Sequence, residues 1–212
     1  AVGLGMPAWG AEFFGQLSTV WPNAAEARAM SDVSSGDDTR IANGARILGA
    51  TAVFDAVLRT GISATIVNAG IRTNVIPTEA TALLNVRTLP GDSIDGVVDR
   101  LRRVVDDPDV EVAVTSRGEE SPASDFTSPL FAAIAETVKE IAPHMVTVPY
   151  MSTGATDSAR LRRLGMQALG MLPFPMDQDD EDRMHGNDER VPLASLDFGT
   201  RLIFGTVYRV TR

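Results

Sequence analysis

The chain has 212 residues, of which 44% are hydrophobic and 22% charged, and these ordinary globular values argue against disorder or a fibrous class. It carries 28 acidic residues against 19 basic ones, a net charge of −9, which argues against a nucleic-acid partner because phosphate binding needs clustered cations. The absence of cysteine excludes disulfides, thiolate nucleophiles and cysteine zinc sites, and no apolar run approaches the roughly 20 residues that span a membrane.

Residues 1–46 predict short helices separated by loop. Helix-like patches cover residues 11–20 and 24–30, and the turn-rich stretch 31–38 follows them. The first seven residues have no basic region and no long apolar run, so we expect no intact signal peptide. The compartment is unknown from composition, with the cytoplasm favoured over an exported location.

Residues 47–118 predict a small α+β unit. The expected elements, in order, are a helix over 47–58, strands over 63–68 and 80–88, a helix over 94–105 and a strand over 110–117. The short connection 70–77 makes the first two strands antiparallel neighbours, and Asp92 or Ser93 can cap the helix that follows. This β-β-α-β order resembles most of a split βαβ sandwich, the ferredoxin-like arrangement.

Residues 119–212 predict an α/β layer after a polar linker. Ser128 and Pro129 fit the N-cap and first turn of a helix that ends before Pro143. The remaining expected elements are a strand over 145–149, a helix over 157–164, a strand over 166–171 and a helix from residue 192 onward. Strands that alternate with helices in this way are typical of an α/β fold.

His185 lies in a loop rich in Gly, Asn, Asp and Glu, just ahead of the last predicted helix. Imidazole is the commonest metal ligand in proteins and titrates near neutral pH, so a metal-binding or acid–base role stands beside that of a surface or capping histidine. The chain has one other histidine, His144, and no cysteine. His185 therefore lacks obvious nitrogen or sulfur partners within this sequence.

Two other polar features fit a binding cleft. The loop 153–158 joins a predicted strand to a predicted helix, so Gly154 and nearby hydroxyl groups can line the carboxyl edge of a sheet while Asp157 favours the helix N-terminus. Asn74 occupies the turn between two strands, and Arg87 is predicted beside that turn on the polar side of the next strand. An ordinary loop, turn or surface role is the alternative for each.

Four motifs occur in an order that resembles one known family. They are residues 70–77 with their Asn-Val-Ile-Pro, residues 85–91 with Asn-Val-Arg and Leu-Pro-Gly, residues 154–157 with Gly-Ala-Thr-Asp, and residues 185–189 with His-Gly-Asn-Asp-Glu. No single motif is specific. Together, over roughly residues 47–212, they resemble the C-terminal half of the aminoacylase/carboxypeptidase-G family of zinc peptidases, peptidase family M-twenty, which includes succinyl-diaminopimelate desuccinylase-like enzymes.

The resemblance implies an α/β protein: part of a zinc-peptidase catalytic α/β layer, and a ferredoxin-like lid that pairs with its twin in a homodimer. In such enzymes a water that bridges two zinc ions, deprotonated by a glutamate, attacks a peptide or N-acyl amino acid amide bond. The implied domains are 1–46 leading into the lid, 47–118 as an incomplete lid and dimerisation domain, and 119–212 as the C-terminal part of the catalytic domain.

The resemblance also assigns roles by position. His185 would be the last metal ligand, Asn74 and Arg87 would be lid residues that reach the substrate, and Gly154, Thr156 and Asp157 would line the pocket for the substrate's terminal carboxylate. Many relatives have Arg two places after the Thr-Asp, where this chain has Ala159 and only then Arg160, so the pattern departs from the family there.

The family's other metal ligands and its Glu-Glu pair precede the lid, and no segment before residue 47 carries them. Glu119 and Glu120 follow the lid and are not assigned the general-base role. We therefore expect the catalytic base upstream of Ala1, and we expect this chain alone to lack activity, since one ligand cannot hold two zinc ions. The alternatives are a non-catalytic dimerisation or binding module from the same family, and a different hydrolase with His185 as its general base.

Overall fold

The computed structural model describes residues 6–118, 120–154 and 156–212. The expectations that fall on residues 1–5, on Glu119 and on Ala155 lie outside these ranges. In the described part of the chain the elements are α1 (Ala8–Ser18), α2 (Ala24–Val33), α3 (Asp38–Leu48), α4 (Ala52–Leu58), β1 (Gly61–Ala69), β2 (Ala80–Arg87), α5 (Ile94–Val105), α6 (Pro129–Ile141), α7 (Ser158–Arg163), α8 (Gln178–Glu181) and α9 (Leu193–Val210). Helices combined with a small sheet confirm the α/β class.

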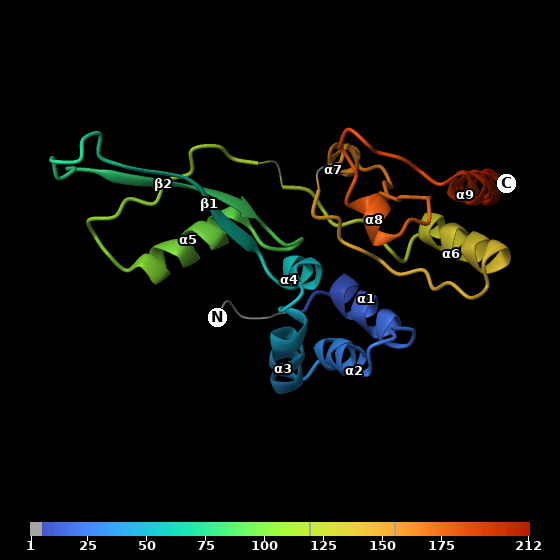
Figure 1. The fold of residues 1–212 in the computed structure, drawn as a ribbon. Helices are drawn as coiled ribbons and strands as arrows, with labels where there is room; N and C mark the ends of the chain where they lie inside the picture. The colour runs from blue at the N-terminus through green and yellow to red at the C-terminus, as the bar shows by residue number, and fades with distance from the viewer. Residues whose placement is uncertain (1–5, 119, 155) are drawn as a thin grey trace.

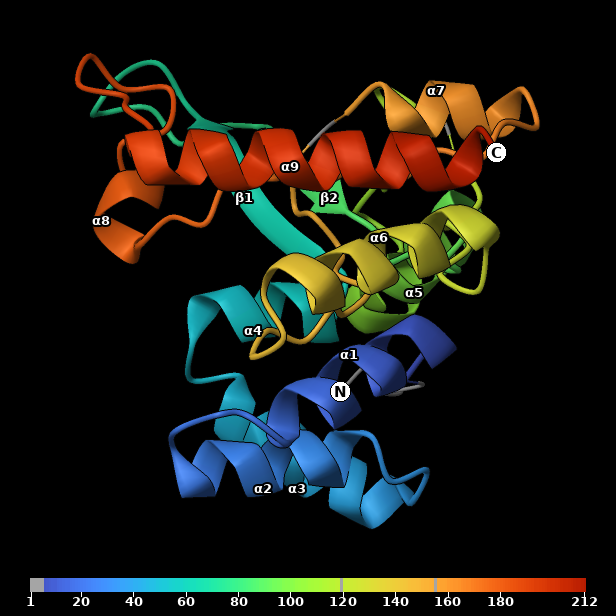
Figure 2. The same ribbon diagram turned by 90° about the vertical axis from the view of Figure 1, so that its right-hand side faces the viewer.

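The elements form three groups in space. Figure 1 shows α1 to α4 gathered below the centre, the β1–β2 hairpin with α5 extending to one side, and α6 to α9 on the other. Figure 2, which looks at the right-hand side of that view, places α9 across the front of the C-terminal group with α6 next to it. The hairpin is therefore an arm that projects away from the His185 loop.

Two helices of the first group, α2 and α3, have side-chain N-caps. The Asn23 side chain accepts hydrogen bonds from two backbone N–H groups in the first turn of α2, and the Asp37 side chain accepts one from Arg40 N at 2.8 Å in α3. The helix expected over 47–58 is wrong in its bounds: α3 ends at Leu48, and α4 starts afresh at Ala52. A helix over 38–48 was not expected, because its capping Asp37 lies in a stretch that resembles a turn.

The main hydrophobic core lies within α1 to α4. Its largest fully buried side chains include Phe14, Met30 and Leu48, and the Phe14 ring lies 4.9 Å from Phe13 and 6.1 Å from Phe54, centroid to centroid. Partly buried residues from later in the chain pack against this cluster: Leu89, Phe126, Val148 and Met151. The N-terminal helices therefore support both the base of the hairpin and the start of the C-terminal group.

The β1–β2 hairpin has one apolar face. The strands pair antiparallel from Gly61 with Arg87 at one end to Ala69 with Ala80 at the other, and a bulge between Ala64 and Ile66 shifts the register. The paired side chains on one face are Ile62 with Val86, Ala64 with Leu84, Val67 with Ala82 and Ala69 with Ala80. Both expected strands and their antiparallel pairing are confirmed, and α5 lies beside them with its Val97 buried (Figure 1).

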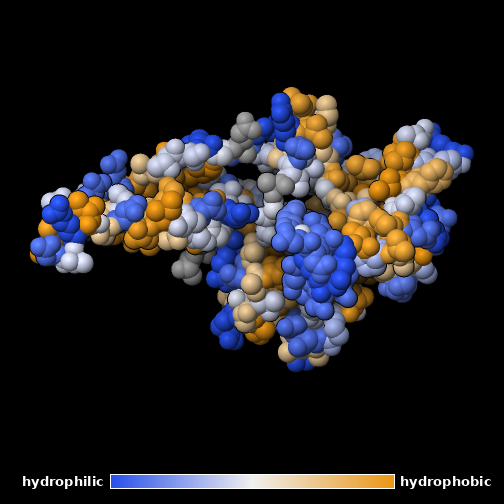
Figure 3. Space-filling model, turned by 45° about the horizontal axis from the view of Figure 1, so that its top comes forward, coloured by the Kyte–Doolittle hydropathy of each residue, from blue (hydrophilic) through white to orange (hydrophobic). Residues whose placement is uncertain are grey.

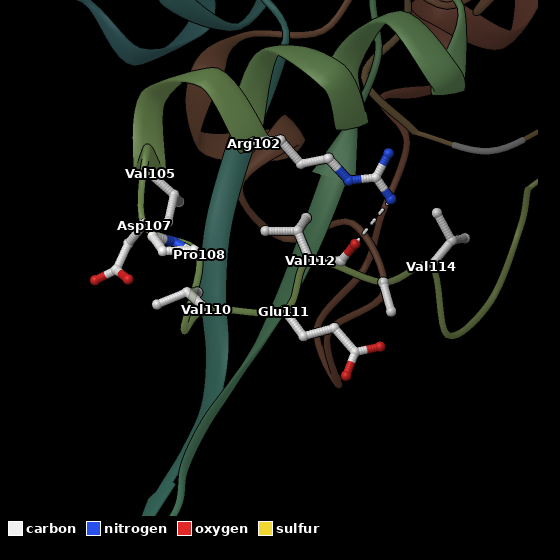
Figure 4. Close-up of a pocket in the computed structure, with 9 residues that line it drawn as sticks. Arg102, Val105, Asp107, Pro108, Val110, Glu111, Val112 and Val114 are labelled. Atoms are coloured by element: carbon white, nitrogen blue, oxygen red, sulfur yellow. Dashed lines mark hydrogen bonds between the residues drawn. The ribbon is translucent and has the colours of Figure 1, made fainter.

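The strand expected over 110–117 is wrong, because the described residues there form no ladder with β1 or β2. Instead, Arg102 of α5 donates a hydrogen bond to the Val112 carbonyl at 3.0 Å, as Figure 4 shows, beside a hollow of about 530 Å³. A side chain thus takes an acceptor that a neighbouring strand would have used. Alternation of apolar residues predicted an extended segment but not its partner.

The C-terminal group is built on α6 and α9. Ser128 is buried and caps α6 by accepting a hydrogen bond from Phe131 N, with Pro129 in the first turn, as expected. Helices α7 and α9 confirm the other two expected helices, whereas the strands expected over 145–149 and 166–171 are wrong. Neither segment has a neighbouring strand in the described residues, and a ladder needs a partner for its backbone groups.

Much apolar surface stays exposed. Figure 3 shows hydrophobic residues on the hairpin arm and over the C-terminal helices. On α9, Leu193 is 84% exposed and Phe204 71%, whereas Leu202 on the opposite side is buried. Among the described helices, none is both long and apolar enough to cross a bilayer.

Candidate functional site

His185 projects from the loop between α8 and α9. Its backbone adopts a left-handed conformation with φ of 65°, a region that is costly for any residue with a Cβ atom. Its N–H donates to Oε2 of Glu189 at 3.1 Å, and the next N–H, of Gly186, donates to the Arg183 carbonyl at 2.9 Å. The residue is exposed, so the loop presents the imidazole to solvent rather than to a packed core.

Four charged residues tie the two sides of this loop together. Arg183 lies 3.7 Å from Asp180 and 3.4 Å from Asp188, and Arg190 lies 3.5 Å and 3.7 Å from the same two carboxylates. The Asp180 side chain is only 13% exposed, so its interactions are less screened than those of an ordinary surface pair. The acidic run that surrounds His185 is thus partly neutralised by arginines from within the same loop.

The described residues do not make up a metal centre by themselves. They contain no group of three or more His, Cys, Asp or Glu side chains arranged to hold an ion. A zinc site needs about four ligands in total, with three protein ligands in the usual catalytic arrangement. His185 can therefore supply at most one donor of a site that requires more.

The base of the hairpin reaches the loop that was expected to line a substrate pocket. Arg87, the last residue of β2, donates through Nη1 to the Thr153 carbonyl at 2.5 Å, across 66 positions of sequence. Gly154 N donates to Ser152 Oγ at 3.2 Å, which shapes the same loop. The structure thus brings together two predicted substrate-binding features, Arg87 and the segment at Gly154.

Thr156 and Asp157 lie on the same loop as exposed residues just ahead of α7. Asp157 is the N-cap residue of this helix, but its side chain makes no capping hydrogen bond; its backbone carbonyl accepts from Arg160 N at 3.1 Å. The expected position at the helix N-terminus is confirmed. The Asp157 carboxylate does not cap the helix.

Asn74 lies far from Arg87. The expectation that Arg87 lies beside the turn is wrong, because Arg87 pairs with Gly61 at the opposite end of the hairpin from the turn. The seven residue steps from Ala80 to Arg87 span roughly 24 Å of strand. Asn74 is exposed in the connection between β1 and β2, beyond that distal end. Arg87 lies on β2, as expected, but at the base of the hairpin and not at the end of the strand next to the turn.

Two features near the site had no clear sequence signal. Arg162 is half-buried and donates to the Pro122 carbonyl at 2.7 Å, to Ser124 Oγ at 3.1 Å and to the Ala168 carbonyl at 3.3 Å. Arg162 therefore connects α7 to the segment that contains Pro122 and Ser124. Tyr150, which precedes the loop, lies 5.6 Å from the Phe13 ring, and partial burial raises the pKa of its hydroxyl, with nearby Glu181 acting in the same direction.

Comparisons with known proteins show which proteins the chain is similar to. Residues 16–113 match the family described as the peptidase dimerisation domain of the M-twenty peptidases. The chain is 33% identical over 166 residues, 76% of its length, to the probable carboxypeptidase S-like 2 of Dictyostelium discoideum, and covers 32% of that protein. It is 28% identical over 162 residues, 75% of its length, to the N-fatty-acyl-amino acid synthase/hydrolase PM20D1 of Homo sapiens, again covering 32%.

A bacterial protein is also similar to this chain in sequence. The chain is 30% identical over 138 residues, 65% of its length, to the putative succinyl-diaminopimelate desuccinylase DapE of Mycobacterium tuberculosis, and covers 35% of that protein. It thus spans about a third of the length of these relatives. No solved structure matches. The chain belongs to the M-twenty family of peptidases, and its hairpin and α5 lie within the stretch that matches the family's dimerisation domain.

Proposed function

We propose that this chain forms part of a zinc-dependent hydrolase that cleaves peptide or N-acyl amino acid amide bonds. The observation that carries the proposal is the His185 loop, in which two arginine–carboxylate pairs and the Glu189 bond hold an exposed imidazole in a left-handed turn. The names of the relatives, a carboxypeptidase S-like protein, an N-fatty-acyl-amino acid synthase/hydrolase and a desuccinylase, support the substrate class. Zinc, when bound, would activate water for attack on the amide carbonyl.

The proposal gives each part of the chain a task. Residues 119–212 would carry the C-terminal part of a catalytic domain, with His185 as one metal donor. Arg87, Gly154, Thr156 and Asp157 would contact the substrate near the base of the arm, because Arg87 already reaches that loop. The remaining metal donors and the general base would come from sequence other than these described residues, which provide no further donor cluster.

The test is hydrolysis with and without a chelator, on a panel of dipeptides and N-acyl amino acids. A longer polypeptide that contains this chain is expected to hydrolyse members of the panel with zinc, and His185→Ala should abolish the activity while His144→Ala, at the only other histidine, leaves it intact. The isolated 212 residues should show none. Zinc-dependent turnover by the isolated chain, or equal activity of the two histidine variants, would contradict the proposal.

We also propose that residues 47–118 act as a lid that pairs two copies of the chain. The matched dimerisation family supports this, and so does the arm itself: every residue of β1 is exposed, Val67 to 68%, on a face whose paired side chains are all apolar. A two-stranded sheet with such a face is marginal without further cover. A second copy would provide that cover.

Sedimentation of the purified chain tests the pairing. The unaltered protein is expected to sediment as a dimer and Val67→Asp as a monomer, because a carboxylate on the apolar face would be buried without a partner. The matched control is Leu193→Asp, which places the same charge at the 84% exposed start of α9. A monomeric unaltered chain, or dissociation by Leu193→Asp instead, would show that the arm is not the interface. A dimer without hydrolysis in any longer form would favour the non-catalytic module.

A further inference from the structure

The His185 backbone requires an explanation, because few residues other than glycine adopt its conformation. Its φ of 65° is one of two positive values at non-glycine residues in the described chain, the other being 44° at Asp106, which ends α5. Left-handed backbone in a residue with a Cβ atom persists only where surrounding contacts enforce it. A glycine follows directly at 186, so the sequence places the strained conformation on the histidine and not on its flexible neighbour.

Glu189 makes the contact that meets this requirement. Its Oε2 accepts the His185 N–H at 3.1 Å, which closes a turn across four residues with a charged acceptor. Hydrogen bonds to an ionised group are stronger than those between neutral groups. If His185 relaxed to an ordinary helical or extended backbone, its N–H would turn away from the carboxylate. The bond and the left-handed conformation therefore support each other.

The ends of the turn are fixed as well. Arg183, two residues before His185, and Arg190, directly after Glu189, each contact both Asp180 and Asp188. Arg183 also donates to the Asp179 carbonyl at 2.6 Å, which anchors it to α8. Residues on both sides of the turn are thus joined to one another. All these contacts come from a single segment between α8 and α9.

The structure assigns Glu189 the role of a positioning residue for His185: its carboxylate accepts the His185 N–H and fixes the left-handed turn that presents the imidazole, while its sequence neighbours Asp188 and Arg190 belong to the ion-paired network. This inference rests on the proposed function insofar as the imidazole is taken as a metal donor. The device consists of residues 179–190, so this segment sets the backbone turn that carries the imidazole before any ligand contributes.

Nuclear magnetic resonance of the 212-residue chain tests the device directly. Glu189→Ala should make the His185 amide proton exchange about tenfold faster, lose its downfield shift and change its coupling to Hα away from the left-handed value. Glu189→Gln keeps an acceptor oxygen and should restore most of the shift and the coupling. Glu181→Ala is the matched control, a glutamate four residues before His185 whose side chain makes no hydrogen bond to the loop in the described structure.

The outcomes separate the device from the proposed function. An unchanged His185 amide in Glu189→Ala, or the same change in Glu181→Ala, would overturn the positioning role. In a longer polypeptide that hydrolyses amides, Glu189→Ala should weaken zinc affinity at the site about tenfold, and Glu189→Gln should recover it. If no such polypeptide hydrolyses the panel, the proposed function fails, while the resonance result still decides whether Glu189 positions His185.

Discussion

Phe14→Ala is expected to lower the free energy of unfolding by about 3–5 kcal/mol, the usual cost of deleting a buried aromatic ring. Phe14 is 0% exposed and lies at the centre of the core formed by α1 to α4, with edge contacts to Phe13 and Phe54. Leu48 and Met30 of the same core are also fully buried, so the deleted ring would leave a cavity among packed side chains. Urea denaturation followed by circular dichroism measures the change.

Phe204→Ala is the matched control for this loss. Phe204 is 71% exposed on α9 and stacks on Tyr208, with ring centroids 6.1 Å apart. Its removal should change the free energy of unfolding by no more than about 0.5 kcal/mol. Equal losses for the two phenylalanines would mean that the N-terminal helices do not hold the principal core.

Gly44→Ala is expected to destabilise the chain by about 2 kcal/mol, although alanine favours a helix interior over glycine by roughly 0.5–1 kcal/mol. A Cβ atom at Gly44 would lie 2.5 Å from the Ala29 carbonyl oxygen and 2.9 Å from Cγ1 of Val33, which is fully buried. Neither neighbour can move without separating α2 from α3. The steric term therefore exceeds the helix-propensity gain.

Gly15→Ala is expected to raise the free energy of unfolding, in contrast to Gly44→Ala. Gly15 lies in the interior of α1, and its added Cβ would meet Ser34 at 3.7 Å, an ordinary van der Waals distance. The propensity gain is then unopposed, so thermal or urea denaturation should show a stabilisation of roughly 0.5–1 kcal/mol. Stabilisation by both variants would contradict the close packing of α2 on α3.

Local signals in the sequence predicted the helices with distinct caps. Ser93 caps α5 and Ser128 caps α6, each by accepting a backbone N–H three residues later, as their positions indicated. Antiparallel β1 and β2 followed from alternation and a short connection. The strand expected over 110–117 failed because alternation describes one chain segment, whereas a ladder depends on a partner strand; at Val112 the carbonyl accepts a hydrogen bond from the Arg102 side chain instead.

The sequence also predicted part of the candidate site. His185 stood out by residue type and by its loop, and the family resemblance gave it a role. Its left-handed backbone, its bond to Glu189 and the contact from Arg87 to Thr153 depend on three-dimensional geometry that no sequence spacing encodes. The last of these joins residues 66 positions apart, beyond the reach of any local pattern.

The arm formed by β1 and β2 meets the rest of the described structure at its base, where β2 ends at Arg87. Near this point Leu89 packs against the N-terminal core and Arg87 is bonded to Thr153. A rotation of about 10° at the base of the arm would move its far end, roughly 24 Å away, by about 4 Å. A small change of angle at the base would therefore displace the turn that holds Asn74 by a much larger distance than it displaces Arg87.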